Sequence, residues 1–366
     1  MNVLIKPVSG SCNMTCGYCF YRDEAENRHV ADYGRMDERT LKNLVRKFVL
    51  ASEGSCTFAF QGGEPTLWGL ERFQKTVEYV EHYNRGRIPV QYSLQTNGIA
   101  LDEAWCRFLK ENHFLVGVSV DGTRKQHDLY RCRKDGTGSY DLVLKKIELL
   151  HRYGVEYNIL TVVHGLNVHA AEEIYEDYKR RGWRYLQFIA CLDPLEGTKG
   201  GQEYSLYPEE YGKFLTKLFE LWYADWEMGR QPYIRQFENY IGILSGFRPD
   251  SCEQDCECGI LHVAEADGSI YPCDFYALDA YYLGNINKVQ VLDLQRRREE
   301  LDFVGRSLAH SKECKSCSWF SLCRGGCYRN RVDGGKNYFC RAYQMLFEAG
   351  YERMCEIAEH ISGFLK

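Results

Sequence analysis

"SCNMTCGYCFY", residues 11–21, places three thiols within eight residues near the start of the chain. Cys12, Cys16 and Cys19 are separated by three residues and then by two. A structural zinc site usually completes four ligands from paired groups, but the nearest further ligand, His29, stands ten residues after Cys19 without a partner. A four-iron cluster is normally held by four thiolates, so three would leave one iron open. Open metal positions are typical of catalytic sites.

Short β-branched or aromatic runs alternate with amphipathic segments around this stretch. The predicted strands cover residues 2–7, 56–61, 90–97, 114–122, 156–163 and 185–191, and the predicted helices cover 37–52, 68–85, 102–112, 139–153 and 168–181. Units of this βα type predict a parallel sheet, either doubly wound or a partial barrel. Because cysteines stand where a dinucleotide fold has its glycine fingerprint, the curved barrel is favoured, with chemistry at the C-terminal strand ends.

The composition describes a folded chain of more than one domain. The 366 residues exceed one compact core of ordinary size, and 45% are hydrophobic and 27% charged. The net charge of −5 and the lack of a long basic run argue against a nucleic-acid partner. No apolar stretch approaches about 18 residues, so no membrane span is expected. The N-terminus lacks a secretory pattern, which predicts a cytoplasmic protein.

The seventeen cysteines are unevenly distributed, with three at residues 12–19 and nine between residues 252 and 340. Disulfides are disfavoured, since cytosolic thiols are kept reduced, and ligation of metals or clusters is the stronger interpretation. An aromatic-rich helix over residues 206–229 is interpreted as a bridge. Short strands, turns and cysteines are expected from about residue 232, and a helix over 341–365. The predicted domains are therefore residues 1–232 and 233–366.

The N-terminal thiol spacing, with Tyr18 directly before the last cysteine, resembles the signature of the radical S-adenosylmethionine enzymes. The resemblance implies a partial (β/α)6 barrel of the radical SAM type. It also implies that the open iron chelates S-adenosylmethionine, whose one-electron cleavage releases a 5′-deoxyadenosyl radical. Tyr18 would then pack around the cluster and the adenine. The cofactor carries the difficult chemistry, while the protein positions it and excludes water.

Four further positions match cofactor contacts of that family. In "FQGGEP" (60–65), two glycines let the backbone approach a ligand, and Gly63 matches the contact to the methionine amino group. Ser119 and Arg131 match contacts to the ribose and the carboxylate, which the fork of arginine suits. Leu192 matches an adenine contact. Without the resemblance, Gly63 would be interpreted as part of a turn that ends a strand, Arg131 as a solvated surface residue and Leu192 as core packing.

The cysteines after residue 250 resemble the SPASM extension, a cysteine-rich domain that holds two auxiliary four-iron clusters. The resemblance assigns one cluster to Cys252, Cys258, Cys273 and Cys327 and the other to Cys314, Cys317, Cys323 and Cys340. Eight thiolates match two closed clusters, and with the N-terminal site the total is three [4Fe-4S] clusters. Cys256 remains an alternative ligand to Cys258. A zinc ribbon also remains open, because both chemistries use Cys-x-x-Cys.

The stretch "DGSIYPCDFYALDAYYLGNI" (267–286), with "FAFQGGEPTL" and "LQFIACLDPL", is most similar to the anaerobic sulfatase-maturating enzymes. The similarity implies oxidation of a cysteine or serine side chain of a sulfatase to Cα-formylglycine. The radical would take a hydrogen from Cβ, and Asp274, directly after Cys273, would be the general base. Asp274 could instead be a solvated turn carboxylate or a cap.

The implied partners are an unfolded or nascent sulfatase polypeptide and a cellular electron donor such as flavodoxin or ferredoxin. Two alternatives stay open: another SPASM peptide-modifying enzyme, forming thioethers or cyclophanes, and a non-catalytic iron–sulfur or zinc module. Because the first strand is predicted to begin near Asn2, we expect no N-terminal peptide-binding extension of the kind that such maturases often carry, which favours the sulfatase interpretation. The sequence does not separate a cysteine substrate from a serine substrate.

Overall fold

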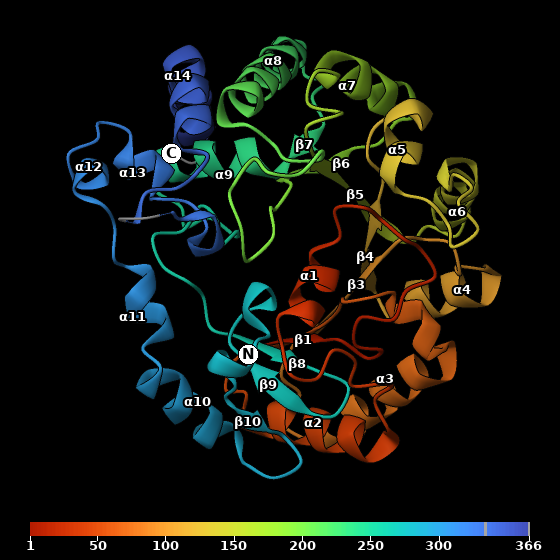
Figure 1. The fold of residues 1–366 in the computed structure, drawn as a ribbon. Helices are drawn as coiled ribbons and strands as arrows, with labels where there is room; N and C mark the ends of the chain where they lie inside the picture. The colour runs from red at the N-terminus through yellow and green to blue at the C-terminus, as the bar shows by residue number, and fades with distance from the viewer. Residues whose placement is uncertain (333–334, 365–366) are drawn as a thin grey trace. The chain divides into compact units, whose positions relative to one another are not determined.

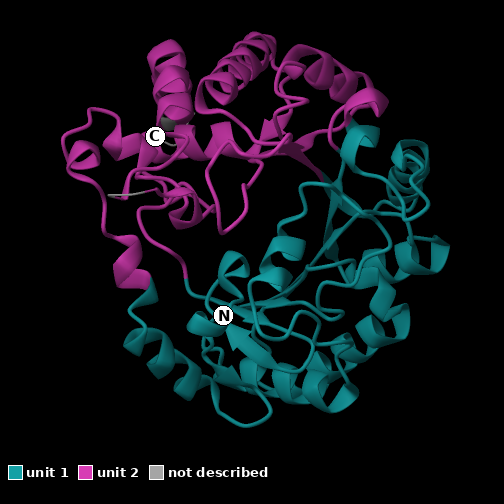
Figure 2. Ribbon diagram, viewed as in Figure 1, with its two compact units in different colours: residues 1–120, 127–158, 260–303 teal, residues 121–126, 159–259, 304–366 magenta. Residues whose placement is uncertain are grey.

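The chain divides into two units in the computed structural model, which describes residues 1–332 and 335–364 (Figure 2). Unit 1 comprises Met1–Val120, His127–Asn158 and Ile260–Phe303, and unit 2 comprises Asp121–Gln126, Ile159–Gly259 and Val304–Lys366. Each unit is therefore assembled from three separate parts of the sequence. None of the described helices combines the length and the apolar character needed to cross a membrane.

Unit 1 is built on a mixed sheet with the strand order β10-β9-β8-β1-β2-β3-β4. Strands β1 (Asn2–Ile5), β2 (Cys56–Phe60), β3 (Val90–Thr96), β4 (Phe114–Ser119) and β8 (Leu261–Ala264) run parallel. Strands β9 (Ser269–Tyr271) and β10 (Gly284–Asn285) are antiparallel. Central strand β1 is buried and apolar, as a parallel strand covered on both faces should be. The cysteine loop follows the C-terminal end of this strand.

Amphipathic helices flank the sheet of unit 1 (Figure 1). They are α2 (Glu38–Ala51), α3 (Leu70–Tyr83), α4 (Glu103–Glu111), α6 (Tyr140–Arg152) and α10 (Val291–Glu300). The short helix α1 (Phe20–Glu26) follows the cysteine loop, and unit 1 also has the 3-10 turns η1 (Pro65–Trp68), η2 (Asp274–Tyr276) and η3 (Asp279–Tyr281). Helix α2 illustrates how the sequence forms these helices. The Asp37 side chain caps its N-terminus by accepting a hydrogen bond from the Thr40 N–H. An apolar stripe that includes Leu44 and Phe48 is fully buried. Helices α5 (Arg124–Tyr130) and α11 (Phe303–Ser307) have residues in both units.

Unit 2 contains parallel strands packed with longer helices. Strand β6 (Tyr185–Ala190) pairs with β5 (Glu156–Val163), whose first three residues belong to unit 1, and with β7 (Tyr233–Ile234). The helices are α7 (Ala171–Arg180), α8 (Pro208–Glu227), α9 (Arg235–Leu244), α12 (Lys312–Lys315), α13 (Phe320–Cys323) and α14 (Cys340–Phe364), with the turn η4 (Tyr328–Asn330). Helices α8 and α14 pack closely: a Cβ on Gly212 would lie 3.1 Å from the Ala342 Cα.

The six predicted strands and the predicted helices are confirmed to within a few residues at each end. The prediction that short strands and turns follow residue 232 is wrong where α9 and α10 form. Helix α10 was missed because "LQRRREE" carries few apolar side chains. Strand β8 lies inside the predicted second domain, yet it pairs in parallel with β1. The units do not test the predicted domain limits, which stay predictions.

Candidate active site and cysteine clusters

The three N-terminal thiols are held by a loop that leads from β1 into α1. The Cys19 N–H donates to the Cys16 carbonyl at 3.2 Å, and Cys19 is the cap residue of α1. The Cys12 sulfur accepts from the Met14 N–H at 3.4 Å. All three cysteines are half-buried, and none of them forms a disulfide. Burial raises the pKa of both Cys12 and Cys19, while the cation of Arg131 opposes this at Cys19.

The turn after β2 fixes this loop through its backbone. Gly63 has a φ of 57°, and a Cβ there would lie 2.3 Å from the Ser11 carbonyl oxygen, so only glycine allows this approach. The next residue, Glu64, donates its N–H to the same oxygen at 2.9 Å. The buried Glu64 carboxylate accepts from the Asn97 N–H at 2.7 Å, and Asn97 Nδ2 donates to Asn13 Oδ1 at 2.7 Å. Sequence reasoning missed Glu64 and Asn97, although both belong to motifs at strand ends.

The residues predicted to bind S-adenosylmethionine are distributed over both units. In unit 1 the buried Tyr18 ring meets Tyr130 edge-on at 5.8 Å between centroids, and the Arg131 guanidinium lies 5.7 Å from the centre of the Tyr18 ring. Ser119 ends β4, and its hydroxyl accepts from Gln95 Nε2 at 3.0 Å. Leu192 follows β6 in unit 2.

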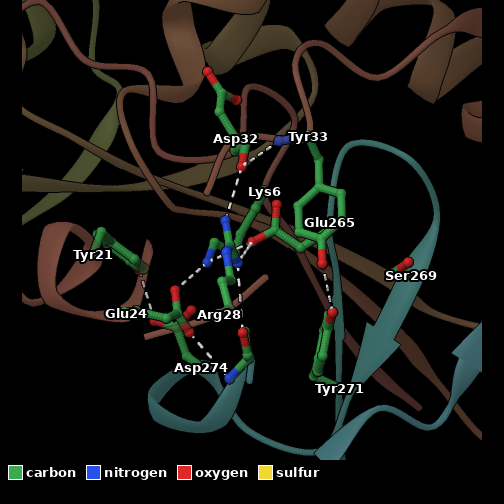
Figure 3. A network of polar contacts seen from close by, with 12 residues as sticks. Lys6, Tyr21, Glu24, Arg28, Asp32, Tyr33, Glu265, Ser269, Tyr271 and Asp274 are labelled. Carbon is green, nitrogen blue, oxygen red and sulfur yellow. Dashed lines mark hydrogen bonds and ion pairs between the residues drawn. The ribbon is translucent and has the colours of Figure 1, made fainter. Parts of the chain in front are cut away.

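The carboxylate of Asp274 belongs to a hydrogen-bonded group of side chains in unit 1 (Figure 3). Its Oδ2 accepts from Tyr21 Oη at 2.6 Å and from Gln61 Nε2 at 2.9 Å, and the Gln61 amide also donates to Tyr21 Oη at 2.8 Å. Its Oδ1 is buried and has no hydrogen-bond partner among the described residues. Asp274 thus presents one oxygen fixed by two donors and one oxygen without a donor.

Four buried charges surround this carboxylate. Lys6 Nζ forms ion pairs with Glu24 Oε2 and, at 2.8 Å, with Glu265 Oε1, and Arg28 Nη1 lies 2.6 Å from the same Glu265 oxygen. Burial raises the pKa of the Asp274 carboxyl, although the Lys6 cation opposes it. Burial would lower the pKa of Lys6, but Glu265 and Glu24 raise it above its usual value. Three carboxyls face two cations, so burial favours retention of one proton in this group.

We call Lys6, Tyr21, Glu24, Arg28, Gln61, Glu265 and Asp274 the Asp274 network. Sequence reasoning found only Asp274. Lys6 is the next-to-last residue of the predicted first strand (2–7), and Tyr21 ends the quoted stretch 11–21, so both were visible as polar groups at strand or loop ends. Glu24, Arg28 and Glu265 had no such signal.

The structure brings together the four thiols predicted for the second auxiliary cluster. Cys314, Cys317, Cys323 and Cys340 line a cavity of about 50 Å³ in unit 2, which we call the four-cysteine cavity. Trp319, Phe320, Tyr343 and Phe347 supply apolar walls, and Lys336 and Glu313 also line it. Burial raises the pKa of the Cys323 thiol to about 12, and the three neighbouring thiols contribute.

Three of the thiols predicted for the first auxiliary cluster are also neighbours in unit 2. Burial raises the pKa of Cys252 to about 11, and the nearby Cys258 adds to this. The pKa of Cys327 is raised mainly by burial and by Glu253, and Cys252 and Cys258 raise it further. Cys256 is exposed, and its sulfur lies 3.7 Å from Asp255 Oδ1 instead. The fourth predicted ligand, Cys273, belongs to unit 1.

None of the seventeen cysteines forms a disulfide. In residues 1–332 and 335–364, no three His, Cys, Asp or Glu side chains are close enough to bind a single metal ion.

Comparison with known proteins identifies the class first. The Radical SAM superfamily profile matches residues 7–178, which contain the cysteine loop and the strands from β2 to β5. The fold and the cysteine loop therefore define a radical S-adenosylmethionine enzyme.

Full-length relatives identify the family. A "Cysteine-type anaerobic sulfatase-maturating enzyme" of Clostridium novyi (strain NT) is 41% identical over 367 residues, covering 99% of this chain and 98% of the relative. A "Serine-type" enzyme of Bacteroides thetaiotaomicron is 31% identical over 373 residues, covering 94% and 88%. A solved structure described as "Native anSMEcpe with bound AdoMet and Cp18Cys peptide" is 41% identical with a TM-score of 0.93, covering 98% and 99%. The chain belongs to the anaerobic sulfatase-maturating enzymes.

These findings confirm the predicted family, the α/β fold class, the enzyme class and the cofactors, S-adenosylmethionine and [4Fe-4S] clusters. The residues present fit these groups. Four thiols line one cavity, three more are neighbours, and the N-terminal loop offers three. The buried oxygen of Asp274 without a donor suits a site completed by a bound substrate. The predicted ligand and cofactor residues stay predictions.

Proposed function

We propose that this chain is a cysteine-type enzyme, which oxidises a cysteine of a sulfatase polypeptide to Cα-formylglycine. The identity to cysteine-type relatives, 41%, exceeds the 31% to a serine-type relative and extends over nearly the whole chain. The observation that carries the chemistry is the buried Asp274 carboxylate, with Oδ2 fixed by Tyr21 and Gln61 and Oδ1 without a donor. Such an oxygen can accept a proton from a thiol placed beside it.

Atoms and electrons balance in this reaction. The cysteine side chain loses one hydrogen atom from Cβ, one proton from sulfur and one electron, which leaves a thioaldehyde. Water then replaces the sulfur, which departs as hydrogen sulfide, and the aldehyde remains. The electron that leaves matches in number the one that S-adenosylmethionine consumes when it is cleaved to methionine and 5′-deoxyadenosine. The net change therefore needs no external oxidant beyond S-adenosylmethionine.

The residues predicted to bind the cluster and S-adenosylmethionine have the following proposed roles. When bound, S-adenosylmethionine on a cluster held by Cys12, Cys16 and Cys19 supplies the 5′-deoxyadenosyl radical. Gly63 and Arg131 bind its amino and carboxylate groups, Ser119 its ribose, and Tyr18 and Leu192 the adenine side. Arg131 lies against Tyr18, so the two side chains can restrain one ligand together.

Asp274 takes the thiol proton. Its raised pKa makes it a stronger base than an ordinary carboxylate, and Tyr21 and Gln61 hold its orientation. The Lys6 cation opposes the effect of burial and so favours the ionised carboxylate that can accept a proton. Burial thus raises the pKa of Asp274, whereas Lys6 and the two hydrogen-bond donors lower it.

The auxiliary thiols serve electron transfer in this proposal. Four ligands to each cluster leave no iron open, which suits electron transfer. Cys314, Cys317, Cys323 and Cys340 would hold the second auxiliary cluster, and the assignment is supported by their common cavity. Cys258 is preferred to Cys256 for the first, because Cys258 is the one near Cys252 and Cys327. Cys273 completes that set by resemblance.

The proposed partners are an unfolded or nascent sulfatase polypeptide and an electron-transfer protein such as flavodoxin or ferredoxin. The peptide substrate is supported by the peptide named with the similar solved structure. The proposed compartment is the cytoplasm, where seventeen thiols would stay reduced.

The test is anaerobic incubation of the holoenzyme with reductant, S-adenosylmethionine and matched sulfatase-like peptides carrying cysteine or serine at one position. Mass spectrometry should show conversion of the cysteine peptide to an aldehyde with loss of sulfur, faster than loss of two hydrogens from the serine peptide. Loss of two hydrogens from the cysteine peptide with sulfur retained would instead indicate thioether formation. Faster reaction of the serine peptide would contradict the cysteine-type assignment.

A further inference from the structure

Arg298, on α10, carries a guanidinium that is almost removed from solvent. The residue is 4% exposed, whereas the side chain of its neighbour Arg297 is 47% exposed and pairs with Glu300. Arg298 Nη2 donates to the Leu261 carbonyl at 2.5 Å. Its Nε and Nη1 are buried and have no acceptor among the described residues. Buried guanidinium groups normally satisfy their donors, so two free ones require an explanation.

The strand register places this guanidinium beside Cys273. Strands β8 and β9 are antiparallel, with Val263 opposite Tyr271. Continued by two residues, the same register sets Leu261, the acceptor of Arg298, opposite Cys273. The backbone at Cys273 is still extended, with φ −154° and ψ 149°. All of these residues belong to unit 1.

No carboxylate compensates the Arg298 charge. Among the residues that the structure describes, no ion pair joins Arg298 to an Asp or Glu, and Cys273 is the group whose negative charge would favour the cation. The nearby His262 is buried and adds no charge at neutral pH, because burial and Arg298 lower its pKa to about 3. A buried cation without a partner is costly, so an anion at the Cys273 position would stabilise it.

We propose that Arg298 raises the reduction potential of the auxiliary cluster that Cys273 ligates, and so helps that cluster to accept the electron from the substrate. The inference rests on the proposed role of Cys273. When Asp274 takes the thiol proton, one electron leaves the substrate radical as the C=S bond forms, and the cluster gains that electron. Reduction adds one negative charge, which a fixed cation and two free N–H donors favour. Asp274 would then take the proton of the substrate, and Arg298 would favour transfer of the electron to the cluster that the neighbouring Cys273 ligates.

The test is an anaerobic potentiometric titration of the reconstituted enzyme, with reduced clusters read by electron paramagnetic resonance. Cys273→Ala identifies the signal that depends on Cys273. Arg298→Gln should shift the midpoint of that signal to a more negative potential and leave the other two clusters in place. Arg297→Gln, one residue away on the exposed face, is the matched control and should titrate like the native enzyme. Cleavage of S-adenosylmethionine without peptide should be unchanged in Arg298→Gln.

The outcomes distinguish the ligand assignment from the role of Arg298. If Cys273→Ala keeps its full iron content and all signals, the proposed ligand assignment fails. If Cys273→Ala loses a cluster but Arg298→Gln titrates like native, the assignment stands and the role of Arg298 is overturned. Should Arg298→Gln not fold, Arg298→Lys decides, because it keeps a charge but loses the planar fork of donors. Its midpoint should lie below the native value, and an unchanged midpoint would overturn the proposal.

Discussion

The Asp274 network and the four-cysteine cavity are both buried, but they are built from opposite materials. The network concentrates carboxyls, cations and a phenol, which exchange protons. The cavity is lined by thiols and aromatic rings, with one exposed lysine–glutamate ion pair at its border. The chain thus keeps the groups that handle protons apart from those suited to electron transfer. Variants in each region should therefore fail in different and recognisable ways.

The largest effect is expected from Asp274→Asn. The amide keeps the size of the side chain but cannot take a proton, so formylglycine formation should fall by about 10²–10⁴-fold. Iron content and cleavage of S-adenosylmethionine without peptide should stay native, since the hydrogen bonds of Asp274 go to Tyr21 and Gln61 and not to the cluster thiols. Mass spectrometry of the peptide and quantification of 5′-deoxyadenosine check this. Asp279→Asn, in the next turn, is the control and should keep its yield.

A second large effect is expected from Cys317→Ala in the four-cysteine cavity. The variant should lose about four of about twelve irons, because a cluster with three thiolates is poorly held. Product formation should fall, whereas cleavage of S-adenosylmethionine should persist. Iron analysis together with the peptide assay checks both. Cys355→Ala, on α14 and outside the predicted ligand set, should retain full iron, and an equal loss there would contradict the assignment of the cavity.

The sequence allowed much of the cavity and little of the network to be predicted. Cysteines are rare and their spacing is informative, so the resemblance to the SPASM extension could group Cys314, Cys317, Cys323 and Cys340 before the structure was seen. Lys6, Glu24 and Glu265 are common residue types, and Glu265 is far from the other two in sequence. Charged side chains are mostly exposed, so nothing in their local patterns indicated burial in one group.

The fold shows the same contrast. Alternating apolar runs predicted β1 to β6 because strand periodicity is a local signal. The parallel pairing of β8 with β1 depends on residues more than 250 positions apart and could not be derived that way. Helix α10 was missed because its charged residues resemble a solvated segment, yet one of them, Arg298, is buried.

A smaller effect is expected from Tyr21→Phe, which removes the 2.6 Å hydrogen bond to Asp274 Oδ2. That bond lowers the pKa of Asp274, so its loss should raise the pKa and move the acid limb of the pH–rate profile to higher pH. A charge-assisted bond is worth about 1.5–3 kcal/mol, and the shift should be on the order of one pH unit. Activity should recover at alkaline pH. Tyr33→Phe, which breaks a bond to Tyr271 in the same unit, should leave the profile unchanged.

The smallest effect concerns stability. The pKa of Asp274 is raised in the folded state, so the folded protein binds its proton more tightly than the unfolded chain does. The contribution of Asp274 to stability is then fully present below the unfolded pKa and is lost as pH rises through the folded pKa. Asparagine carries no charge at any pH and escapes this loss.

Asp274→Asn should therefore gain in unfolding temperature relative to native enzyme as the pH rises, because its amide never carries a buried charge. Anaerobic thermal unfolding should show a larger advantage at about pH 9 than at about pH 6. A variant less stable than native at both pH values would mean that the ionised carboxylate stabilises the network, and that Asp274 carries no stability penalty for its role as a base.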